Sequence, residues 1–465
     1  MKFITTMLLS LLGFALFSSA QQEIYRPSEV TQAIFFDISP PLRDMPVIEP
    51  SKVDRSWKDG VIKNKLDMPD YRNLPLPVTT EDDYRNAQTF QGDRSSELLL
   101  SVNGVGNVNF VIPPDTHGDV GPNHYMQMVN LSFAIWNKSG TMVYGPASNK
   151  SLWNGFPGPW SNSNDGDPIV LYDEQADRWI ASQFALPNYP NGPFYEMIAV
   201  SQTGDPTGSW YRYAFQFTNM PDYPKLGVWH NGYYLSVNSF SSGSLNWAGT
   251  GVAALDRTKM LAGDPTASMI FFTTPSGGDP SSFLPADCDG TPAPAGSPAL
   301  FGYMRDGNPD RLVLYQLNAD WTTPSNSTFS QLVTLNVQSF SASISGIPQK
   351  GTSVKLDELS GRLMYRLQYR NFGVYQTMVT NHSVNVAGHA GVRWYELRNS
   401  GSGWQIYQQG TYSPDDTYRW MGSVAMNTYG DIALGYSASS STLFPSIRFT
   451  GRRASDPLEI GRAHV

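Results

Sequence analysis

Acidic side chains stand just before several predicted strands, where chain segments from different parts of a fold could meet. They come from separate stretches of the sequence: Asp115, Asp167, Asp222 and Asp287. If these carboxylates converge, two of them could serve as the acid and the base or nucleophile of a glycosidase. The competing interpretation is structural, because Asp at a strand entry commonly forms a side-chain turn with the backbone. The sequence leaves both open.

Some of these residues lie in short oxygen-rich runs around a glycine, and such runs are compatible with a bound Ca²⁺. The candidate ligands are Asp165, Asp167, Asp287 and Asp289. Carboxylate oxygens are the ligands that this cation prefers. Neither run has the spacing and terminal Glu of a calcium-binding loop, and the histidines do not have the spacing of a zinc site. A structural cation is therefore a hypothesis from ligand chemistry alone.

Basic and aromatic residues near the predicted strand entries are candidates for ligand binding. They are Lys225, Arg419, Trp420, Arg366, Arg370 and His117. In RLMYRLQYR, Arg366 and Arg370 fall on one face of a strand because side chains alternate along it. Two such guanidinium groups could clamp the carboxylate of an acidic sugar. Alternatively, they could pair with Asp or with carbonyl groups and staple neighbouring sheets together.

The elements that would position these residues repeat along the chain. One unit reads DPIVLYD, RWIASQF, EMIAVS and WYRYAF, and the next reads KLGVW, YYLSVNSF, GVAALD and MIFFTT, with turn residues between the strands. A four-stranded unit recurring about every 40–50 residues is the pattern of a β-propeller blade. Six units are recognisable, and a missing last strand predicts a seventh blade in the intact protein.

Three of the unit boundaries decide where the candidate residues fall. The fourth unit is predicted to begin at ALFGYMRD, so that Asp287 and Asp289 precede it. The fifth is predicted to begin at TSVKLD and to continue with RLMYRLQYR, GVRWYELR and WQIYQQGTY. The sixth is predicted to begin at MGSVAMN, directly after Arg419 and Trp420.

The ends of the chain differ from the repeats in composition. Residues 1–20 have a short basic start, an apolar run and small residues at the end, which predicts a secretory signal peptide. Residues 21–96 are rich in proline and are expected to form an extended arm. Residues 97–458 form the predicted all-β propeller, and 459–465 are interpreted as a sequencing-adaptor artefact.

Composition excludes several classes of partner. The formal net charge of −8 argues against nucleic acid, and no later apolar run is long enough to span a bilayer. Cys288 is the only cysteine, so no disulfide within the chain can form in an oxidising compartment. A large apolar core must replace disulfides, and 40% hydrophobic residues supply it.

Several motifs taken together resemble an uncharacterised family of secreted, mostly bacterial, β-propeller-like proteins. They are PPDTHGDVGPNHY, GDPIVLYDEQADRW, AVSQTGDPTGSWYRYAF, RLMYRLQYRNFG and GVRWYELR. The resemblance implies a propeller, often followed by surface-sorting or adhesion modules, and no established reaction comes with it.

These observations favour a secreted or cell-surface propeller that binds an extracellular polymer, either glycan or protein, at its central mouth. Loops that enter the innermost strands of a propeller surround that mouth. The alternatives are a glycan-cleaving enzyme that uses the mouth carboxylates, and a structural module of a larger surface protein.

Overall fold

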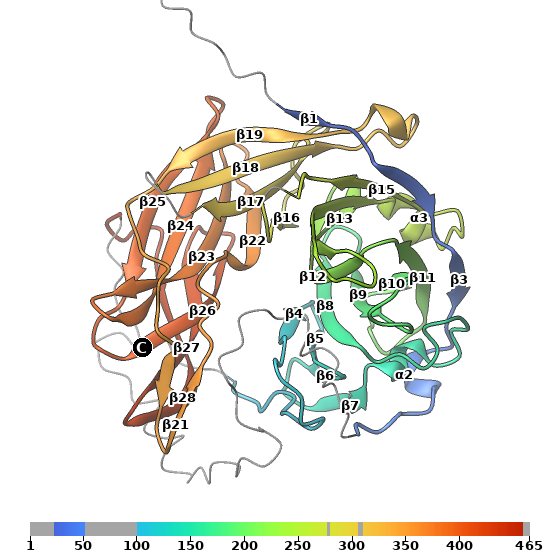
Figure 1. Ribbon diagram of the computed structural model, residues 1–465, viewed down its shortest axis with the longest axis horizontal. Coiled ribbons are helices and arrows are strands. Elements are labelled where there is room, and N and C mark those ends of the chain that lie inside the picture. Colours follow the sequence, from blue (N-terminus) through green and yellow to red (C-terminus); the bar gives the residue numbers. More distant parts are fainter. Residues whose placement is uncertain (1–22, 52–99, 277–279, 306–309, 459–465) are drawn as a thin grey trace, which may run out of the picture.

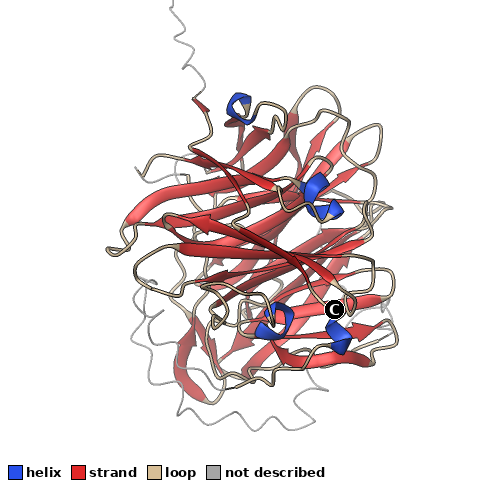
Figure 2. Ribbon diagram, turned by 90° about the vertical axis from the view of Figure 1, so that its right-hand side faces the viewer, coloured by secondary structure: helices blue, strands red, loops and turns tan. Residues whose placement is uncertain are grey.

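The protein is a β-propeller in this computed structural model, which describes residues 23–51, 100–276, 280–305 and 310–458. Its sheets follow one another around a common centre, and strands dominate the described part of the chain (Figures 1 and 2). The predicted signal peptide, residues 1–20, and the predicted artefact, residues 459–465, lie outside the described residues. Within the described residues, no helix is long and apolar enough to cross a membrane.

Sheets 1 to 3 each contain four consecutive strands. Sheet 1 comprises β4 (His117–Val120), β5 (His124–Val129), β6 (Ser132–Asn137) and β7 (Met142–Ser148). Sheet 2 comprises β8 (Gly166–Asp173), β9 (Arg178–Ala185), β10 (Phe194–Ser201) and β11 (Trp210–Phe217). Sheet 3 comprises β12 (Met220–Trp229), β13 (Gly232–Phe240), β14 (Trp247–Leu255) and β15 (Ser268–Thr273).

Sheets 4 to 6 complete the described propeller. Sheet 4 comprises β16 (Leu284–Asp289), β17 (Ala299–Arg305), β18 (Arg311–Asn318) and β19 (Thr328–Asn336). Sheet 5 comprises β22 (Met364–Asn371), β23 (Gln376–Val386), β24 (His389–Asn399) and β25 (Trp404–Tyr412). Sheet 6 comprises β26 (Tyr418–Met426), β27 (Ile432–Ser440) and β28 (Leu443–Arg452).

Helices are short and lie in the connections. They are α2 (Lys150–Trp153), α3 (Arg257–Ala262) and the 3₁₀ turns η1 (Leu42–Asp44) and η4 (Pro324–Asn326). A separate hairpin consists of β20 (Ile347–Gln349) and β21 (Thr352–Leu356).

The first strand of each sheet contacts the first strand of the next, in the order β4, β8, β12, β16, β22 and β26. These inner strands therefore line the centre. The apolar core lies between neighbouring sheets: Met126 and Ile135 of sheet 1 share one cluster with Val170 and Trp179 of sheet 2. Because both faces of a central sheet are covered, β10 is buried at every position.

All three of the predicted boundaries of the fourth, fifth and sixth units are wrong, and the first is that of the sixth unit, because β26 begins at Tyr418 instead of at MGSVAMN. TSVKL is β21 and pairs with β20, so the inner strand of sheet 5 is β22, which carries Arg366 and Arg370. Asp287 and Asp289 lie within β16, the inner strand of sheet 4, instead of preceding it. Parallel pairing of β16 with β22 joins sheets 4 and 5, a long-range contact that local patterns do not reveal.

The described part of the proline-rich arm adds strands to the outside of the propeller. β1 (Ile24–Tyr25) pairs with β19, β2 (Glu29–Gln32) with β15, and β3 (Phe35–Ile38) with β11, all antiparallel. The arm thus runs along the outer edges of sheets 4, 3 and 2 in turn, where Figure 1 shows it in blue. At β3, Asp37 also binds the buried Arg212, with Nη2 to Oδ2 at 2.7 Å.

Inner strands begin with an irregular backbone on the side of the predicted mouth. Asp167 and Tyr223 have φ values of 47° and 54°, and the pairing register shifts beside each of them. Asp115, just before β4, has φ of 41°. Left-handed backbone is unfavourable for residues with a Cβ atom, and such conformations concentrate at binding and catalytic sites. A residue with left-handed backbone thus changes the direction of the side chains at the start of each of three neighbouring strands.

Candidate functional site

Four of the predicted residues gather where the inner strands of sheets 1 to 3 begin, and we call this set the acidic rim. It consists of Asp115, Asp167, Asp222 and Lys225, all partly exposed. Asn130 links two of its members, because Nδ2 donates to Asp115 Oδ2 at 2.9 Å and Oδ1 accepts from the Asp167 N–H at 2.9 Å. These residues therefore lie close together, although Asp167 is within β8 and Asp222 and Lys225 are within β12, where the sequence analysis expected loops before the strands.

Lys225 carries the positive charge of the acidic rim. Burial lowers the pKa of this amine to about 8, while the charges of Asp115, Asp167 and Asp222 oppose the shift. Its Nζ lies 3.6 Å from the centre of the Tyr223 ring and donates to the Pro224 carbonyl at 2.8 Å. A cation over a phenol ring is stabilised by the negative face of that ring. The Lys225 side chain is therefore held among carboxylates, and its pKa of about 8 lies close to neutral pH.

Arg362 brings a second cation to the same place. Its guanidinium lies 4.9 Å from the centre of the Tyr223 ring, so that Tyr223 lies against two cations. The positive charge of Arg362 further lowers the pKa of Lys225. Sequence reasoning did not select Arg362, although it opens the same RLMYRLQYR run.

Glu196 lies behind the acidic rim on β10 and was also missed. Its side chain has no exposed surface, and burial raises the pKa of this carboxyl to about 8, with the Asp167 charge raising it further and Lys225 lowering it. A single acidic residue in the otherwise apolar strand FYEMIAVS is the signal that could have found it, because an unpaired buried carboxylate is costly. Glu196 is thus neutral at pH 7, beside the ionisable Asp167.

His117 is not an exposed ligand-binding residue as predicted. It is buried, its ring lies 4.6 Å from that of Tyr365, and burial together with the Lys225 charge lowers its pKa to about 3. The imidazole is therefore neutral and packed against Tyr365.

Asp287 is separated from the acidic rim, contrary to the predicted ring of four carboxylates. It lies near the far ends of the inner strands in a second set, the arginine cluster, which consists of Asp119, Asp287, Asp289, Arg366 and Arg370. Arg366 Nη2 is 2.9 Å from Asp287 Oδ2 and 2.5 Å from Asp289 Oδ1. Asp287 Oδ1 also accepts from the Val228 N–H, at the end of β12.

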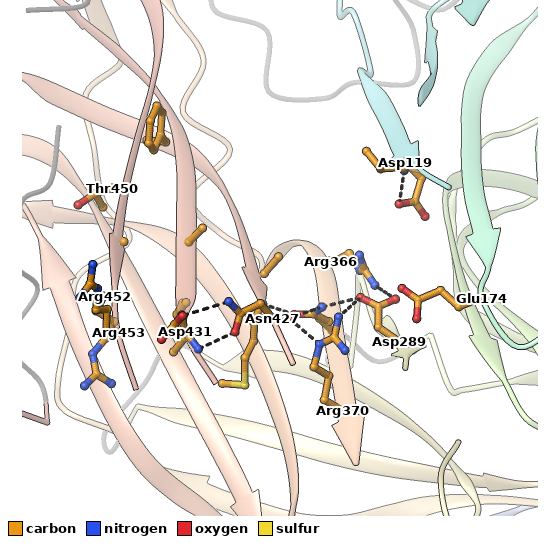
Figure 3. Close-up of a pocket in the computed structure, with 18 of the residues that line it drawn as sticks. Asp119, Glu174, Asp289, Arg366, Arg370, Asn427, Asp431, Thr450, Arg452 and Arg453 are labelled. Carbon is orange, nitrogen blue, oxygen red and sulfur yellow. Dashed lines mark hydrogen bonds and ion pairs between the residues drawn. The ribbon is translucent and has the colours of Figure 1, made fainter. Parts of the chain in front are cut away.

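Arg366 and Arg370 hold inner strands together, which favours the staple interpretation over the clamp. Arg370 Nε donates to the Met426 carbonyl at 2.5 Å, and its Nη2 is 3.7 Å from Asp289 Oδ2 (Figure 3). Burial raises the pKa of Asp287 to about 7 and that of Asp119 to about 6, and Arg366 opposes both shifts. Arg366 and Arg370 therefore bind carboxylates and a carbonyl group of the protein itself.

The four predicted cation ligands do not form one site. Asp165 accepts from the Leu186 N–H at 2.7 Å, Asp167 belongs to the acidic rim, and Asp287 and Asp289 pair with Arg366. Among the described residues, no group of three or more His, Cys, Asp or Glu side chains is arranged to hold a metal ion. The oxygen-rich runs serve backbone turns and ion pairs instead.

Arg419 and Trp420 lie away from the acidic rim and are buried. Arg419 pairs with Asp415, with Nη1 to Oδ1 at 2.9 Å, and Trp420 packs with Ile347 and Ala390. Both residues belong to β26 instead of a loop before it, so their predicted ligand-binding role is not supported by their position.

A cavity of about 590 Å³ opens beside the arginine cluster, between sheet 6 and the ends of β4 and β8. Figure 3 shows Asp119 and Glu174 on one side and Asp431, Thr450, Arg452 and Arg453 on the other. Its polar groups mostly bind one another or the backbone: Glu174 accepts from the Gly290 N–H, and Asp431 from the Ala454 N–H. The cavity wall from sheet 6 includes Phe449 and Ala433.

Comparison with known proteins finds similarity in structure but not in sequence. No protein-family model matches the chain, and no curated protein matches its sequence. The family resemblance described above therefore stays a prediction.

The solved structures that it resembles include an endo-arabinase, an arabinanase and an arabinofuranosidase. The endo-arabinase of Bacteroides thetaiotaomicron is 16% identical with a TM-score of 0.32, covering 63% of this chain and 95% of that one. The α-L-arabinanase of Penicillium chrysogenum is 9% identical (TM-score 0.39, 75% and 96% covered). The GH93 α-L-arabinofuranosidase of Fusarium graminearum is 10% identical (TM-score 0.36, 74% and 93% covered). At such scores these likenesses carry no argument about activity.

Proposed function

We propose that the protein binds a glycan at the acidic rim. The observation that carries this proposal is the convergence of partly exposed Asp115, Asp167 and Asp222, from three sheets, around Lys225. Adjacent sugar hydroxyls can donate to carboxylates and accept from an ammonium group, so such a set suits a polyol. Binding sites of this kind combine few fixed polar groups with aromatic walls, here Tyr223.

Secretion and a place outside the cell or on its surface belong to the same proposal. They rest on the predicted signal peptide, residues 1–20. An extracellular polymer is then the partner that such a protein would meet. The sequence also leaves open that the ligand at the same mouth is a protein.

Cleavage of the glycan is the second candidate, and one observation favours it. Glu196 is neutral at pH 7 and lies close enough to Asp167 for their charges to interact. Two carboxyl groups whose environments separate their pKa values are the arrangement that general acid and base catalysis requires. However, Glu196 has no exposed surface, so it cannot reach a substrate in this structure. Binding is therefore the better-supported function.

The test measures binding and hydrolysis on the same panel of soluble polysaccharides. Affinity electrophoresis should retard the wild type on at least one polymer, and Asp167→Asn should reduce that retardation at least tenfold. Asp264→Asn is the matched control, because it removes the same charge from an exposed turn outside the rim. Absence of binding to every polymer, or equal loss in the control, would contradict the proposal. Release of reducing ends that Glu196→Gln abolishes would establish cleavage.

A further inference from the structure

Asn130 is a buried residue that joins separate segments of the acidic rim. It lies directly after β5 in sheet 1 and is 2% exposed. Its Nδ2 donates to the Pro113 carbonyl at 2.7 Å and to Asp115 Oδ2 at 2.9 Å, and its Oδ1 accepts from the Asp167 N–H at 2.9 Å. The amide therefore uses both of its donor hydrogens and its acceptor oxygen. Through these bonds it connects the segment before β4 to the start of β8.

Both aspartates that Asn130 connects have unfavourable backbone. Asp115 and Asp167 have φ values of 41° and 47°. Asp167 is also left out of the pairing between β8 and β9, because the register shifts between Gly166 and Ile169. Left-handed backbone at a residue with a Cβ atom persists only where the surrounding contacts fix it. The Asn130 side chain supplies such a contact at each of the two aspartates.

A similar contact holds the inner strand of sheet 6, but it involves no carboxylate. In β26, Met421 has φ of 47° and lies at a shift in the pairing register. Its N–H donates at 3.3 Å to Oγ of the buried Ser383, which lies on β23, the second strand of the preceding sheet. Asn130 likewise follows the second strand of the sheet that precedes β8. The additional bond from Asn130 to Asp115 has no counterpart at Ser383 among the hydrogen bonds of the described residues, and it acts on the rim.

The chemistry of an amide explains why this position suits asparagine. One planar group must donate to the Asp115 carboxylate and accept from the Asp167 N–H at the same time. A carboxylate at this position could still accept from the Asp167 N–H, but it would face Asp115 at hydrogen-bond distance. Two carboxylates so close together do not ionise jointly, so they either share a proton or move apart. An alanine at this position would remove the bonds to both aspartates.

We propose, on the basis of the proposed glycan binding, that Asn130 is a positioning residue of the acidic rim, whose amide holds Asp115 and Asp167 in the arrangement that binds the ligand. Asn130 is buried, so it acts on the glycan only through the direction of these two aspartates. Loss of its bond to Asp115 alone is then enough to weaken binding, even where its bond to Asp167 and the fold are kept. Asn130 therefore determines affinity without contacting the ligand.

The experiment measures the affinity of the full chain for the polysaccharide that the wild type binds, by isothermal titration at pH 7 and pH 5. Asn130→Asp keeps an acceptor for the Asp167 N–H but should lose at least tenfold in affinity at pH 7, because its carboxylate repels that of Asp115. At pH 5 the two carboxylates can share a proton and form a hydrogen bond again, so most of the loss should disappear. The other charged or titratable groups near Asp115 and Asp167 are unchanged in this variant, so each affinity is compared with that of the wild type at the same pH. They are Asp222, Lys225, Arg362, Glu196 and His117.

A pair of alanine variants separates positioning from stability. Asn130→Ala and the matched control Ser383→Ala each remove the side-chain acceptor of a left-handed residue, so both should lower the melting temperature. Only Asn130→Ala should also lower the affinity of the folded protein at least tenfold, at pH 7 and at pH 5 alike.

The outcomes distinguish the role of Asn130 from the proposed function. If the wild type binds a polysaccharide, the positioning role is overturned by unchanged affinity in Asn130→Asp at pH 7, by a loss in that variant that is the same at pH 5, or by equal losses in the two alanine variants. Glycan binding at the rim would still stand after any of these results. Absence of binding by the wild type to every polysaccharide would instead overturn the proposed function, and the positioning role with it.

Discussion

The acidic rim and the arginine cluster contain the same kinds of residue but differ in their surroundings. The rim lies at the starts of β4, β8 and β12, and the cluster lies on β4, β16 and β22. Each brings together three aspartates and basic side chains. In the arginine cluster, Arg366 binds Asp287 and Asp289 directly. In the rim, the central cation is Lys225, whose pKa is lowered to about 8, and the carboxylates remain partly exposed.

The difference shows that residue type does not distinguish a structural ion-pair network from a site that is open to a ligand. Guanidinium groups keep their charge at all physiological pH values and match carboxylates with two donors, so they suit permanent contacts. A lysine amine changes charge readily when it is buried. Exposure and the choice of cation, taken together, separate the rim from the cluster.

The largest effect should come from breaking the arginine cluster. Arg366→Met leaves Asp287 buried without its cation and Asp289 with Arg370 alone, and removing one partner of a buried ion pair costs about 3–5 kcal/mol. Urea unfolding should show this loss at pH 7. Arg419→Met is the matched control, because its partner Asp415 is 58% exposed and returns to water at little cost. Equal destabilisation by the two variants would remove the distinction between a staple and an ordinary ion pair.

Glu196 should make the rim side of the molecule sensitive to pH. Its pKa rises from the ordinary value of 4.5 to about 8 in the folded protein, so the folded state holds this proton more tightly than the unfolded state. The resulting stability is complete below pH 4.5 and is lost as the pH rises to 8. Glu196→Gln should remove this loss. At pH 8.5 the variant should therefore have a free energy of unfolding about 2–4 kcal/mol higher than that of the wild type, measured by urea unfolding.

Two measurements test the prediction for Glu196. At pH 4 the wild type and Glu196→Gln should differ little, since the carboxyl is then protonated in both states. Parallel stability curves of the wild type and Glu196→Gln from pH 4 to pH 9 would show that the pKa of Glu196 is the same in the folded and unfolded states, and the second candidate function would lose its acid.

Much of this architecture could be predicted from the sequence, because the repeats are local patterns. Strands DPIVLYD to WYRYAF and their turns follow from alternation and turn chemistry, and they place Asp167 and Asp222 at strand entries. The errors arose where long-range pairing decides the structure. The Asp287 run, with Pro285 before it and Gly290 after it, has the composition of a loop, but it forms β16 through its pairing with β17 and β22.

The candidate site was predicted only in part, for related reasons. The expectation that loops at one end of a propeller meet selected Asp115, Asp167, Asp222 and Lys225, although the last three lie within β8 and β12 and not in loops. Glu196 is on the third strand of its sheet, where a side chain is expected to belong to the core. Only its acidic type indicates that it could have another role. Arg419 was misplaced because β26 begins one residue before it.

The smallest expected effect concerns the charge of Lys225 and depends on the proposed function. If its ammonium group donates to the bound glycan, affinity should fall as the pH passes its pKa of about 8, because the neutral amine no longer balances Asp115, Asp167 and Asp222. One pKa unit corresponds to about 1.4 kcal/mol, so binding should weaken about tenfold between pH 7 and pH 9. Lys225→Arg keeps the positive charge and should abolish this pH dependence while retaining binding. The measurement is isothermal titration with the polysaccharide that the wild type binds best, at pH 7, 8 and 9. A pH dependence that persists in Lys225→Arg would assign the titration to a group other than Lys225 and would contradict the prediction.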